Sequence, residues 1–263
     1  MSAQNFSITP IPAFNDNYLW LIYQPGGLAV IVDPGDAKPV FDFLDEKHLT
    51  LSAILVTHRH WDHINGIEDL RESFDIPVYG PDSADIPQIT HALHEGDQLK
   101  LLDNQLSLKV MAVPGHTREH IAYFGDIDGQ PSLFCGDTLF AGGCGRLFDG
   151  THEQLRQSLE RLKQLPGDTK VYCTHEYTLS NLTFAQLVEP DNAQLRARVD
   201  SEYRMRELNQ PTLPTTIELE RVTNPFLRYQ EPSIRQSINQ YWNESWTTPQ
   251  DLFAGLRRWK DEF

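Results

Sequence analysis

Apolar residues follow two different periods along this chain, and the difference predicts where strands and helices lie. Continuous or alternating apolar runs bounded by turn residues are typical of strands, and apolar residues three and four apart are typical of amphipathic helices. On this basis we predict strands over residues 17–23, 28–33, 51–56, 76–79, 98–101, 107–113, 120–124, 132–135 and 170–173. The same criterion predicts helices over residues 38–48, 64–74 and 151–165.

The pattern changes after His175, where strong strand signals stop and helical periodicity continues to Phe263. Prolines interrupt this helical tail at Pro211, Pro214, Pro225 and Pro232. Strands alternating with helices, followed by helices alone, indicate an α/β layered domain and a smaller helical one. We therefore predict an α/β domain over residues 1–170 and a helical domain over residues 171–263.

The composition is that of an ordinary globular protein with an acidic balance. At 263 residues and 40% hydrophobic content, the chain can bury one large core or two modest ones. The formal net charge of -15 argues against a nucleic-acid surface, which needs a basic stripe. No apolar stretch approaches the roughly 20 residues of a membrane span, so we expect no membrane contact. An acidic chain that binds an anionic small molecule must gather its cations locally.

The expected location is the cytoplasm. Residues 1–6 lack the basic start and the apolar core of a secretory signal. Cys135, Cys144 and Cys173 are an odd number without paired spacing, so we expect reduced, buried thiols rather than a disulfide framework. We also expect a monomer whose partner is a small-molecule substrate.

One segment directly after a predicted strand carries much of the available chemistry: Thr57-His58-Arg59-His60-Trp61-Asp62-His63. In an extended segment side chains alternate, so His58, His60 and Asp62 would share one side. His63 would turn in as the chain enters the next helix. Two imidazoles near one point make half of a metal site, and an imidazole with a carboxylate makes half of a second. Scattered surface histidines would not give this spacing.

Three more polar residues stand alone just past apolar runs: His116, Asp137 and His175. Open α/β folds place functional groups at such strand ends, so we expect the three to converge on the cluster. Together the seven side chains supply five imidazoles and two carboxylates. That is enough for two metals about 3.5 Å apart, bridged by one carboxylate and one water. The other histidines lack this placement and are interpreted as structural or exposed: His48, His91, His94, His120 and His152.

Four motifs resemble the metallo-β-lactamase superfamily: Thr-His-x-His-x-Asp-His at 57–63, Pro-Gly-His-Thr at 114–117, Gly-Asp-Thr-Leu-Phe at 136–140 and Thr-His-Glu-Tyr at 174–177. Other segments are similar, more narrowly, to its glyoxalase II branch, the hydroxyacylglutathione hydrolases. They are Ala-Gly-Gly-Cys-Gly-Arg at 141–146, Asn181, Val188-Glu189-Pro190, Asn224-Pro225-Phe226 and Leu-Arg-Arg-Trp-Lys-Asp at 256–261. The resemblance covers essentially the whole chain, and the motifs of the tail are its most specific part.

The resemblance implies a fold and a metal site. The fold would be a four-layer αββα sandwich followed by a smaller C-terminal helical domain that binds glutathione. One metal would take His58, His60 and His116, the other would take Asp62, His63 and His175, and Asp137 would bridge the two. Ligation by His and carboxylate without Cys suits zinc, iron and manganese, and zinc is the expected ion.

The family's glutathione contacts fall, by the same resemblance, on Arg146, Phe148, Tyr177, Arg257 and Lys260. A common form of the pattern has Lys at position 146 and Tyr at position 148. Arg keeps the charge and can bind a carboxylate through two donors, whereas Phe lacks a hydroxyl that would bond the peptide. Arg257 and Lys260 are three apart and would share one helix face, where they would set specificity rather than chemistry.

The activity implied by the resemblance is hydrolysis of the thioester S-D-lactoylglutathione, and of related 2-hydroxyacylglutathiones, to glutathione and D-lactate. This is the second step of methylglyoxal detoxification. A water bridging two divalent metals has its pKa lowered from about 16 toward about 7, and the hydroxide would attack the thioester carbonyl. One metal would stabilise the oxyanion while Asp62 orients the nucleophile. The leaving thiolate, with a pKa of about 8.5, needs little help from an acid.

Three alternatives share parts of this pattern. A β-lactamase on the same scaffold would carry a secretory signal and would need no glutathione contacts. A one-iron glutathione persulfide dioxygenase would leave His63 and His175 idle and bind one metal per chain. A non-catalytic metal-binding interaction module would be expected to have lost ligands. For the tail, Arg257 and Lys260 could instead form a solvated basic patch neutralised by neighbouring acidic residues.

Overall fold

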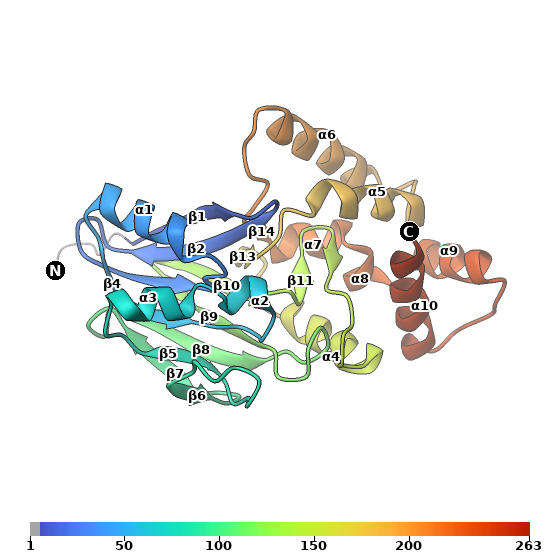
Figure 1. Cartoon of the computed structure of the whole chain (residues 1–263). Coiled ribbons are helices and arrows are strands. Elements are labelled where there is room, and N and C mark those ends of the chain that lie inside the picture. Colours follow the sequence, from blue (N-terminus) through green and yellow to red (C-terminus); the bar gives the residue numbers. More distant parts are fainter. Residues whose placement is uncertain (1–5) are drawn as a thin grey trace. The chain divides into compact units, whose positions relative to one another are not determined.

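The structure is a computed structural model that describes residues 6–263, and it divides into two compact units. The first unit comprises the chain up to Ala112 together with Glu119–Gly136. The second comprises Val113–Arg118 and Asp137–Phe263. Figure 1 shows the elements of both units, coloured along the chain.

One sheet of the first unit contains, within residues 6–263, six strands in the order β1-β2-β3-β4-β5-β6. Neighbours are antiparallel from β1 to β3 and parallel from β3 to β6. The bounds are β1 Ser7–Ala13, β2 Asn17–Tyr23, β3 Leu28–Val32, β4 Thr50–Leu55, β5 Val78–Pro81 and β6 His91–Leu93. Because β3 and β4 are parallel, the residues that follow them, Asp33 and Thr57, come to the same edge of the sheet.

Two helices, α1 (Ala37–Lys47) and α3 (Ile67–Ser73), cover one face of this sheet (Figure 1). Val40 of α1 and Leu70 of α3 are fully buried and belong to one apolar core with side chains of the strands. Each side chain of this kind stabilises the fold by roughly 1.5–3 kcal/mol when it leaves water. The core therefore fixes the sheet edge that carries the polar cluster.

The second sheet of this unit is an antiparallel succession of four strands, β7 (Gln98–Leu101), β8 (Leu106–Ala112), β9 (Ile121–Ile127) and β10 (Gln130–Gly136). The fully buried Tyr123 of β9 donates a hydrogen bond of 2.7 Å to the carbonyl of Val56, which follows β4 of the first sheet. The two sheets therefore pack face to face. With α1 and α3 outside the first sheet, the unit is layered α/β/β.

The second unit consists mainly of helices. Its strands are short: β11 (Leu139–Phe140) pairs with β12 (Gly143–Cys144), and β13 (Lys170–Cys173) pairs with β14 (Thr215–Thr216), all antiparallel. The helices are α4 His152–Leu162, α5 Thr178–Val188, α6 Ala193–Glu207, α7 Ile217–Thr223, α8 Pro225–Arg228, α9 Pro232–Trp242 and α10 Pro249–Glu262. Helix α5 packs against α6, and α10 packs against α4, α8 and α9.

A buried polar network holds the hairpin formed by β11 and β12. Glu220 of α7 is fully buried, pairs with Arg198 of α6 at 2.7 Å and accepts a 2.8 Å hydrogen bond from the Gly142 N–H at the hairpin tip. Asn224 donates a 2.8 Å hydrogen bond to the carbonyl of Gly143. Since these groups are buried, the loss of any one would leave its partners unsatisfied. The network thus ties the hairpin to α6 and α7.

Most predicted elements are confirmed, and the strand predicted at residues 170–173 coincides with β13. The strand β1 was not predicted, because Pro10 and Pro12 interrupt its apolar pattern. Proline removes a backbone donor and is tolerated on edge strands, and β1 lies at the edge of its sheet.

The helix predicted over residues 64–74 is wrong as a single element. The chain forms α2 (Trp61–Ile64), breaks at Gly66 and resumes as α3. The N–H of Gly66 donates to the carbonyl of Pro34 at 2.9 Å, and a Cβ at this position would lie 2.6 Å from that oxygen. Close approach of two backbones therefore requires glycine here and interrupts the helix.

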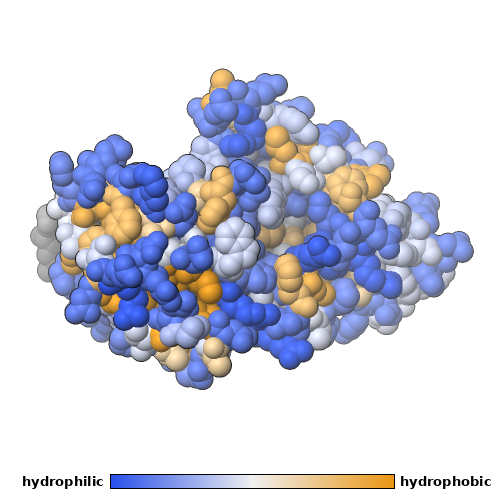
Figure 2. All heavy atoms as spheres, viewed as in Figure 1, coloured by the Kyte–Doolittle hydropathy of each residue, from blue (hydrophilic) through white to orange (hydrophobic). Residues whose placement is uncertain are grey.

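No helix within residues 6–263 is both long and apolar enough to cross a membrane. Hydrophilic residues predominate on the face that Figure 2 shows, in keeping with the formal net charge of -15. Cys135, Cys144 and Cys173 are buried thiols outside any disulfide bond, as predicted. The expectation about a secretory signal concerns residues 1–6, of which 1–5 lie outside the described residues.

Candidate metal centre

Four predicted ligands of the first unit lie together just beyond the end of β4. The Nε2 of His58 is 3.0 Å from the Nδ1 of His60, and the Nε2 of His63 is 3.6 Å from the Oδ2 of Asp62. The rings of His58 and His63 have centroids 4.1 Å apart, and both side chains are fully buried. This segment therefore gathers three imidazoles and one carboxylate, as the sequence predicts.

Asp62 does not belong to an extended segment, so that part of the prediction is wrong. The extended backbone ends at His60, and Asp62 lies in the first turn of α2. Its Oδ2 accepts a 3.0 Å hydrogen bond from the side-chain amide of Asn17, which is buried. A helical turn brings Asp62 beside His63, whereas an extended chain would have separated them on opposite sides.

The sequence analysis did not single out Asp33, which orients this half of the centre. Asp33 is buried, and its carboxylate accepts hydrogen bonds of 2.7 Å from both the N–H and the hydroxyl of Thr57. Its Oδ2 also lies 3.0 Å from the Nδ1 of His63. A carboxylate at one ring nitrogen of a histidine fixes the ring and leaves the other nitrogen for a metal. Its place directly after β3 was the signal available in the sequence.

The second unit holds the other three predicted ligands. The Oδ2 of Asp137 is 3.5 Å from the Nε2 of His116 and 3.3 Å from the Nε2 of His175. All three side chains are buried. Two histidine nitrogens thus approach one oxygen of a single carboxylate, which is the arrangement that a carboxylate shared between two ions requires.

Backbone and ring contacts orient these side chains. The Nδ1 of His116 is 2.7 Å from the carbonyl oxygen of Arg146, so its Nε2 faces Asp137 as the ligand atom. The ring of His175 stacks on that of Tyr177, with centroids 4.7 Å apart and planes 3° apart. The donor set, imidazoles and carboxylates that are mostly buried, fits divalent metal ions.

The remaining histidines differ in burial: His152 is half-buried, and His120 is buried close to the predicted ligands. His48, His91 and His94 are exposed. His120 is buried, lies 3.0 Å through its Nδ1 from the carbonyl oxygen of Ile121, and stacks on His58 with ring centroids 4.5 Å apart. His120 therefore packs against a proposed ligand.

Comparison with known proteins decides the family. Residues 15–175 match the family model of the metallo-beta-lactamase superfamily, and residues 176–263 match that of the hydroxyacylglutathione hydrolase C-terminus. A protein of Hahella chejuensis named hydroxyacylglutathione hydrolase is 50% identical over 256 residues, which cover 97% of this chain and 99% of the relative. The chain belongs to the hydroxyacylglutathione hydrolase (glyoxalase II) family.

Solved structures agree with this assignment at the level of the fold. ETHE1 from Myxococcus xanthus is 26% identical, with a TM-score of 0.64 over 97% of this chain and 96% of that one. TTHA1623 in a di-iron-bound form is 27% identical, with a TM-score of 0.59 over 83% of this chain and 100% of that one. The predicted class, a metallo-β-lactamase αββα sandwich with a C-terminal helical domain, is confirmed. The domain boundary at residues 170 and 171 stays a prediction.

A cavity in the second unit gathers most of the residues that the glyoxalase II resemblance assigns to glutathione. Its volume is about 260 Å³, and it is lined by Phe140, Cys144, Arg146, Tyr177, Ser180, Asn181, Arg257 and Lys260. Phe148 does not line it; its ring is 61% exposed and lies edge-on to His116 at 5.1 Å. Four of the five predicted contacts are therefore brought together, and Phe148 stands apart from them.

The two cationic residues of α10 differ in how they are held. Arg257 is buried; its Nη1 donates to the carbonyl of Cys144 at 3.0 Å, and its Nη2 donates to Asp261 at 3.1 Å. Lys260 is only half-buried, and its Nζ lies 5.0 Å from the ring centroid of Phe184. Burial, together with the nearby Arg257, lowers the pKa of Lys260 from 10.5 to about 8. Arg257 thus builds the cavity wall, while Lys260 is a cation that an anion would stabilise.

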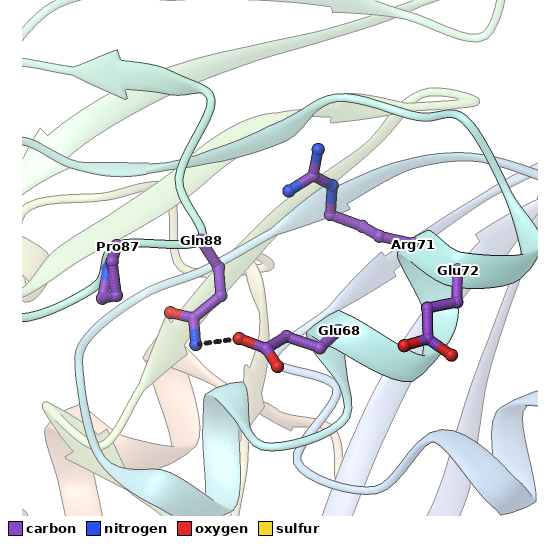
Figure 3. A pocket seen from close by; sticks show the side chains of 5 residues that line it. All are labelled: Glu68, Arg71, Glu72, Pro87 and Gln88. Atoms are coloured by element: carbon purple, nitrogen blue, oxygen red, sulfur yellow. Dashed lines mark hydrogen bonds between the residues drawn. The ribbon is translucent and has the colours of Figure 1, made fainter.

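Another cavity, in the first unit, holds none of the predicted site residues. It has a volume of about 380 Å³ and lies between α3 and the segment before β6 (Figure 3). Glu68, Arg71 and Glu72 of α3 line it, and Gln88 donates a 3.4 Å hydrogen bond to Glu68. The three charged side chains are exposed and therefore hydrated, which does not indicate a site that encloses a ligand.

Proposed function

We propose that this protein hydrolyses S-D-lactoylglutathione and related 2-hydroxyacylglutathiones to glutathione and a 2-hydroxy acid, D-lactate in the first case. The observation that carries the proposal is the near-complete overlap with relatives named hydroxyacylglutathione hydrolase, at 50% identity over 97% of the chain. Relatives in Nitrosomonas europaea and Vibrio campbellii carry the same name at 48% and 49% identity. The full set of seven metal-capable side chains supports the same conclusion.

The proposed metal centre combines the ligands of both units. One ion would be held by His58, His60 and His116, and the other by Asp62, His63 and His175. Asp137 would be shared, because its Oδ2 is approached by the Nε2 atoms of both His116 and His175. Two divalent ions held there would supply Lewis-acid activation of the thioester carbonyl and of the attacking water.

The chain's own residues position the reactants. Asp62 is the proposed group that orients the attacking water, and its Oδ2, which lies 3.6 Å from the Nε2 of His63, accepts a hydrogen bond from the Asn17 amide. The Asp33 carboxylate holds the His63 ring through its Nδ1. No side-chain acid is needed for the leaving group, since a thiol with a pKa of about 8.5 departs readily as the thiolate near neutral pH.

Glutathione would bind in the cavity of the second unit. Arg146 and Lys260 supply the positive charge that a dicarboxylate requires in a protein of net charge -15, and Tyr177 adds a ring and a hydroxyl. Arg257 would act mainly by holding the Cys144 carbonyl and thus the cavity wall. Phe148, exposed and outside the cavity, would contact the peptide through its ring alone.

Zinc is the ion we propose, with iron and manganese as the alternatives that the ligand set also accommodates. The related structure of TTHA1623 was solved in a di-iron-bound form. We further propose that the protein acts in the cytoplasm as a monomer, on a small molecule and without a nucleic-acid or membrane partner.

The deciding experiment is an assay of lactoylglutathione hydrolysis by the metal-loaded protein, with release of the thiol and of D-lactate both measured. Stoichiometric formation of the two products is expected. Oxygen consumption with glutathione persulfide and no hydrolysis would favour the one-iron dioxygenase, which the names of the relatives do not support. Metal binding without either reaction would favour an interaction module.

A further inference from the structure

The hairpin of residues 139–144, formed by β11 and β12, lies in the sequence between two groups of the proposed site. Asp137, the carboxylate proposed to be shared by two ions, precedes it, and Arg146, a proposed glutathione contact, follows it. Phe140 and Cys144 of the hairpin itself line the cavity of about 260 Å³ in the second unit. The position of the hairpin therefore decides the shape of one wall of that cavity.

Buried side chains of the same unit bond the main chain of this hairpin. Within residues 6–263, β11 and β12 form a sheet of two strands, which is marginally stable on its own. The side-chain amide of Asn224 donates to the carbonyls of Phe140 and Gly143, at 3.2 and 2.8 Å. The carboxylate of Glu220 accepts a hydrogen bond from the Gly142 N–H at 2.8 Å. Asn224 and Glu220 are both 0% exposed, so water does not replace these bonds when they are lost.

The two carboxylate oxygens of Glu220 have different partners. Its Oε1 pairs with the Nη2 of Arg198 at 2.7 Å and accepts a 2.6 Å hydrogen bond from the hydroxyl of Thr215. Its Oε2 accepts hydrogen bonds from the Gly142 N–H and, at 2.9 Å, from the side-chain amide of Asn224. Because a buried guanidinium requires an acceptor, Arg198 keeps Oε1 in place. Oε2 is then the atom that holds the hairpin tip.

We propose that Glu220 and Asn224 are positioning residues for substrate binding, which hold the hairpin so that its side chains form the wall of the glutathione cavity. This inference rests on the proposed hydrolase function and names residues that act on the substrate through the hairpin. Among the described residues, the lining of the cavity includes neither of the two. They should therefore affect the binding of the glutathione part equally in the ground and transition states, which changes KM and leaves kcat nearly unchanged.

The first variant is Glu220→Gln, which keeps the volume of the side chain. Because Arg198 and Thr215 retain the amide oxygen, the amide NH2 would face the Gly142 N–H, donor against donor. KM for lactoylglutathione should rise about tenfold, as for one lost charge-assisted contact. Calorimetry should show the same loss for S-methylglutathione, an unreactive thioether. The metal content, kcat and the hydrolysis of S-lactoyl-N-acetylcysteamine, which lacks the peptide, should stay at their wild-type values.

Asn224→Ser is the second variant, since Ser can keep the cap on the Phe226 N–H at the start of α8 but lacks the amide that bonds the hairpin. It should raise KM in the same way. Glu202→Gln is the matched control. Glu202 is buried and pairs with the Nε of Arg198 at 3.4 Å, so it belongs to the same network, but among the described residues its hydrogen bond goes to Arg198 and not to the hairpin. Its KM should equal that of the wild type.

A lower midpoint of urea unfolding in Glu220→Gln and Asn224→Ser, with wild-type KM and wild-type affinity for S-methylglutathione, would overturn the proposal, because the contacts would then serve stability alone. Failure of both variants to fold would overturn it for the same reason. Loss of metal together with the rise in KM would assign the two residues to the metal centre and also overturn it. A wild type that binds S-methylglutathione but hydrolyses no thioester would overturn the hydrolase function alone, since the binding measurement still tests the hairpin.

Discussion

The two halves of the proposed metal centre are held in place by different means. In the first unit, the ligands follow one another along the chain, and buried side chains orient two of them: Asp33 lies 3.0 Å from His63, and Asn17 donates a hydrogen bond to Asp62. In the second unit, three ligands come from separate segments, and a backbone carbonyl faces the Nδ1 of His116 while a ring stacks on His175. The comparison indicates that one side-chain substitution can displace a ligand of the first half and weaken metal binding. In the second half, the backbone fixes much of the ligand geometry.

The largest effect is expected from Asp33→Ala. The substitution removes the carboxylate beside the His63 Nδ1 and leaves the hydroxyl and N–H of Thr57 without their acceptor. Loss of such a carboxylate lowers metal affinity about 10–100-fold, and activity should fall with it. Competition with a chromophoric chelator measures the affinity.

Glu119→Gln is the control for this variant. Glu119 pairs at 2.6 Å with the side chain of Arg59, which lies between His58 and His60, and it also accepts a hydrogen bond from the Arg59 N–H, an acceptor role that Gln keeps. The control should bind metal like the wild type. If Asp33→Ala bound metal with wild-type affinity, the first half would not depend on the Asp33 carboxylate.

In the second unit, substitution of Arg257 should have the largest effect on the cavity, because its guanidinium donates a hydrogen bond to the main chain of the hairpin strand β12. Arg257→Ala should lower the free energy of unfolding by about 2–3 kcal/mol, the loss typical of hydrogen bonds from a buried charge. It should also raise KM for lactoylglutathione, because Cys144 lines the cavity. Urea unfolding and steady-state kinetics measure the two effects.

Arg258→Ala is the matched control, since its guanidinium stacks on Trp242 at 4.8 Å and is exposed. Its cost should be only about 0.5–1 kcal/mol, without a change in KM. If Arg257→Ala raised KM with no loss of stability, Arg257 would be a direct substrate contact and not a support of the wall.

Lys260→Gln tests the contact with the substrate separately from the stability of the fold. A lost charge-assisted contact of about 1–2 kcal/mol raises KM about 5–30-fold. Because Lys260 is remote from the thioester, kcat should be nearly unchanged, and so should hydrolysis of a small thioester without the glutathione peptide. An unaltered KM for lactoylglutathione would mean that Lys260 belongs to a solvated basic patch.

The same residue predicts a pH dependence. Its pKa of about 8 means that Lys260 is protonated below that value and loses its charge as pH rises through it. KM for lactoylglutathione should therefore rise above about pH 8 in the wild type, and this rise should be smaller in Lys260→Gln. The unfolded chain has the higher pKa of 10.5, so it binds more protons between the two values, and the Lys260 contribution to stability increases with pH across that window.

The smallest effect on metal binding is expected from Tyr177→Leu. The ring stacked on His175 contributes orientation worth about 0.5–1.5 kcal/mol, so metal affinity should fall only about 2–10-fold. KM should rise as well, because Tyr177 lines the cavity. The conservative variant Tyr177→Phe keeps the ring and should restore metal affinity. A loss of metal affinity as large as that of Asp33→Ala would mean that a side chain also determines the ligand geometry of the second half.

The sequence predicted the ligands of the first half better than their geometry. The spacing of His58, His60 and His63 after an apolar strand identifies them, since local order is enough to bring them together. Asp62 sits in the first turn of the short helix α2, and the N–H of Gly66, where the chain breaks before α3, lies 2.9 Å from the Pro34 carbonyl, a contact that no local pattern contains. Asp33 was missed for the same reason, because its partner Thr57 is distant in sequence.

The helical tail shows the same limit. Its helices follow from periodicity, and the three-residue spacing of Arg257 and Lys260 correctly predicts one face of α10. Which of the two is buried does not follow from spacing, since it depends on the β12 carbonyl that Arg257 bonds.

The most direct test of the account is the number of metal ions per chain, measured by mass spectrometry of the intact protein and by elemental analysis, together with hydrolysis of lactoylglutathione. The account predicts two ions per wild-type chain. Asp137→Ala should lose metal and most of the activity together, because its Oδ2 is the oxygen that both His116 and His175 approach. A wild type that is fully active with one ion per chain would contradict the binuclear centre.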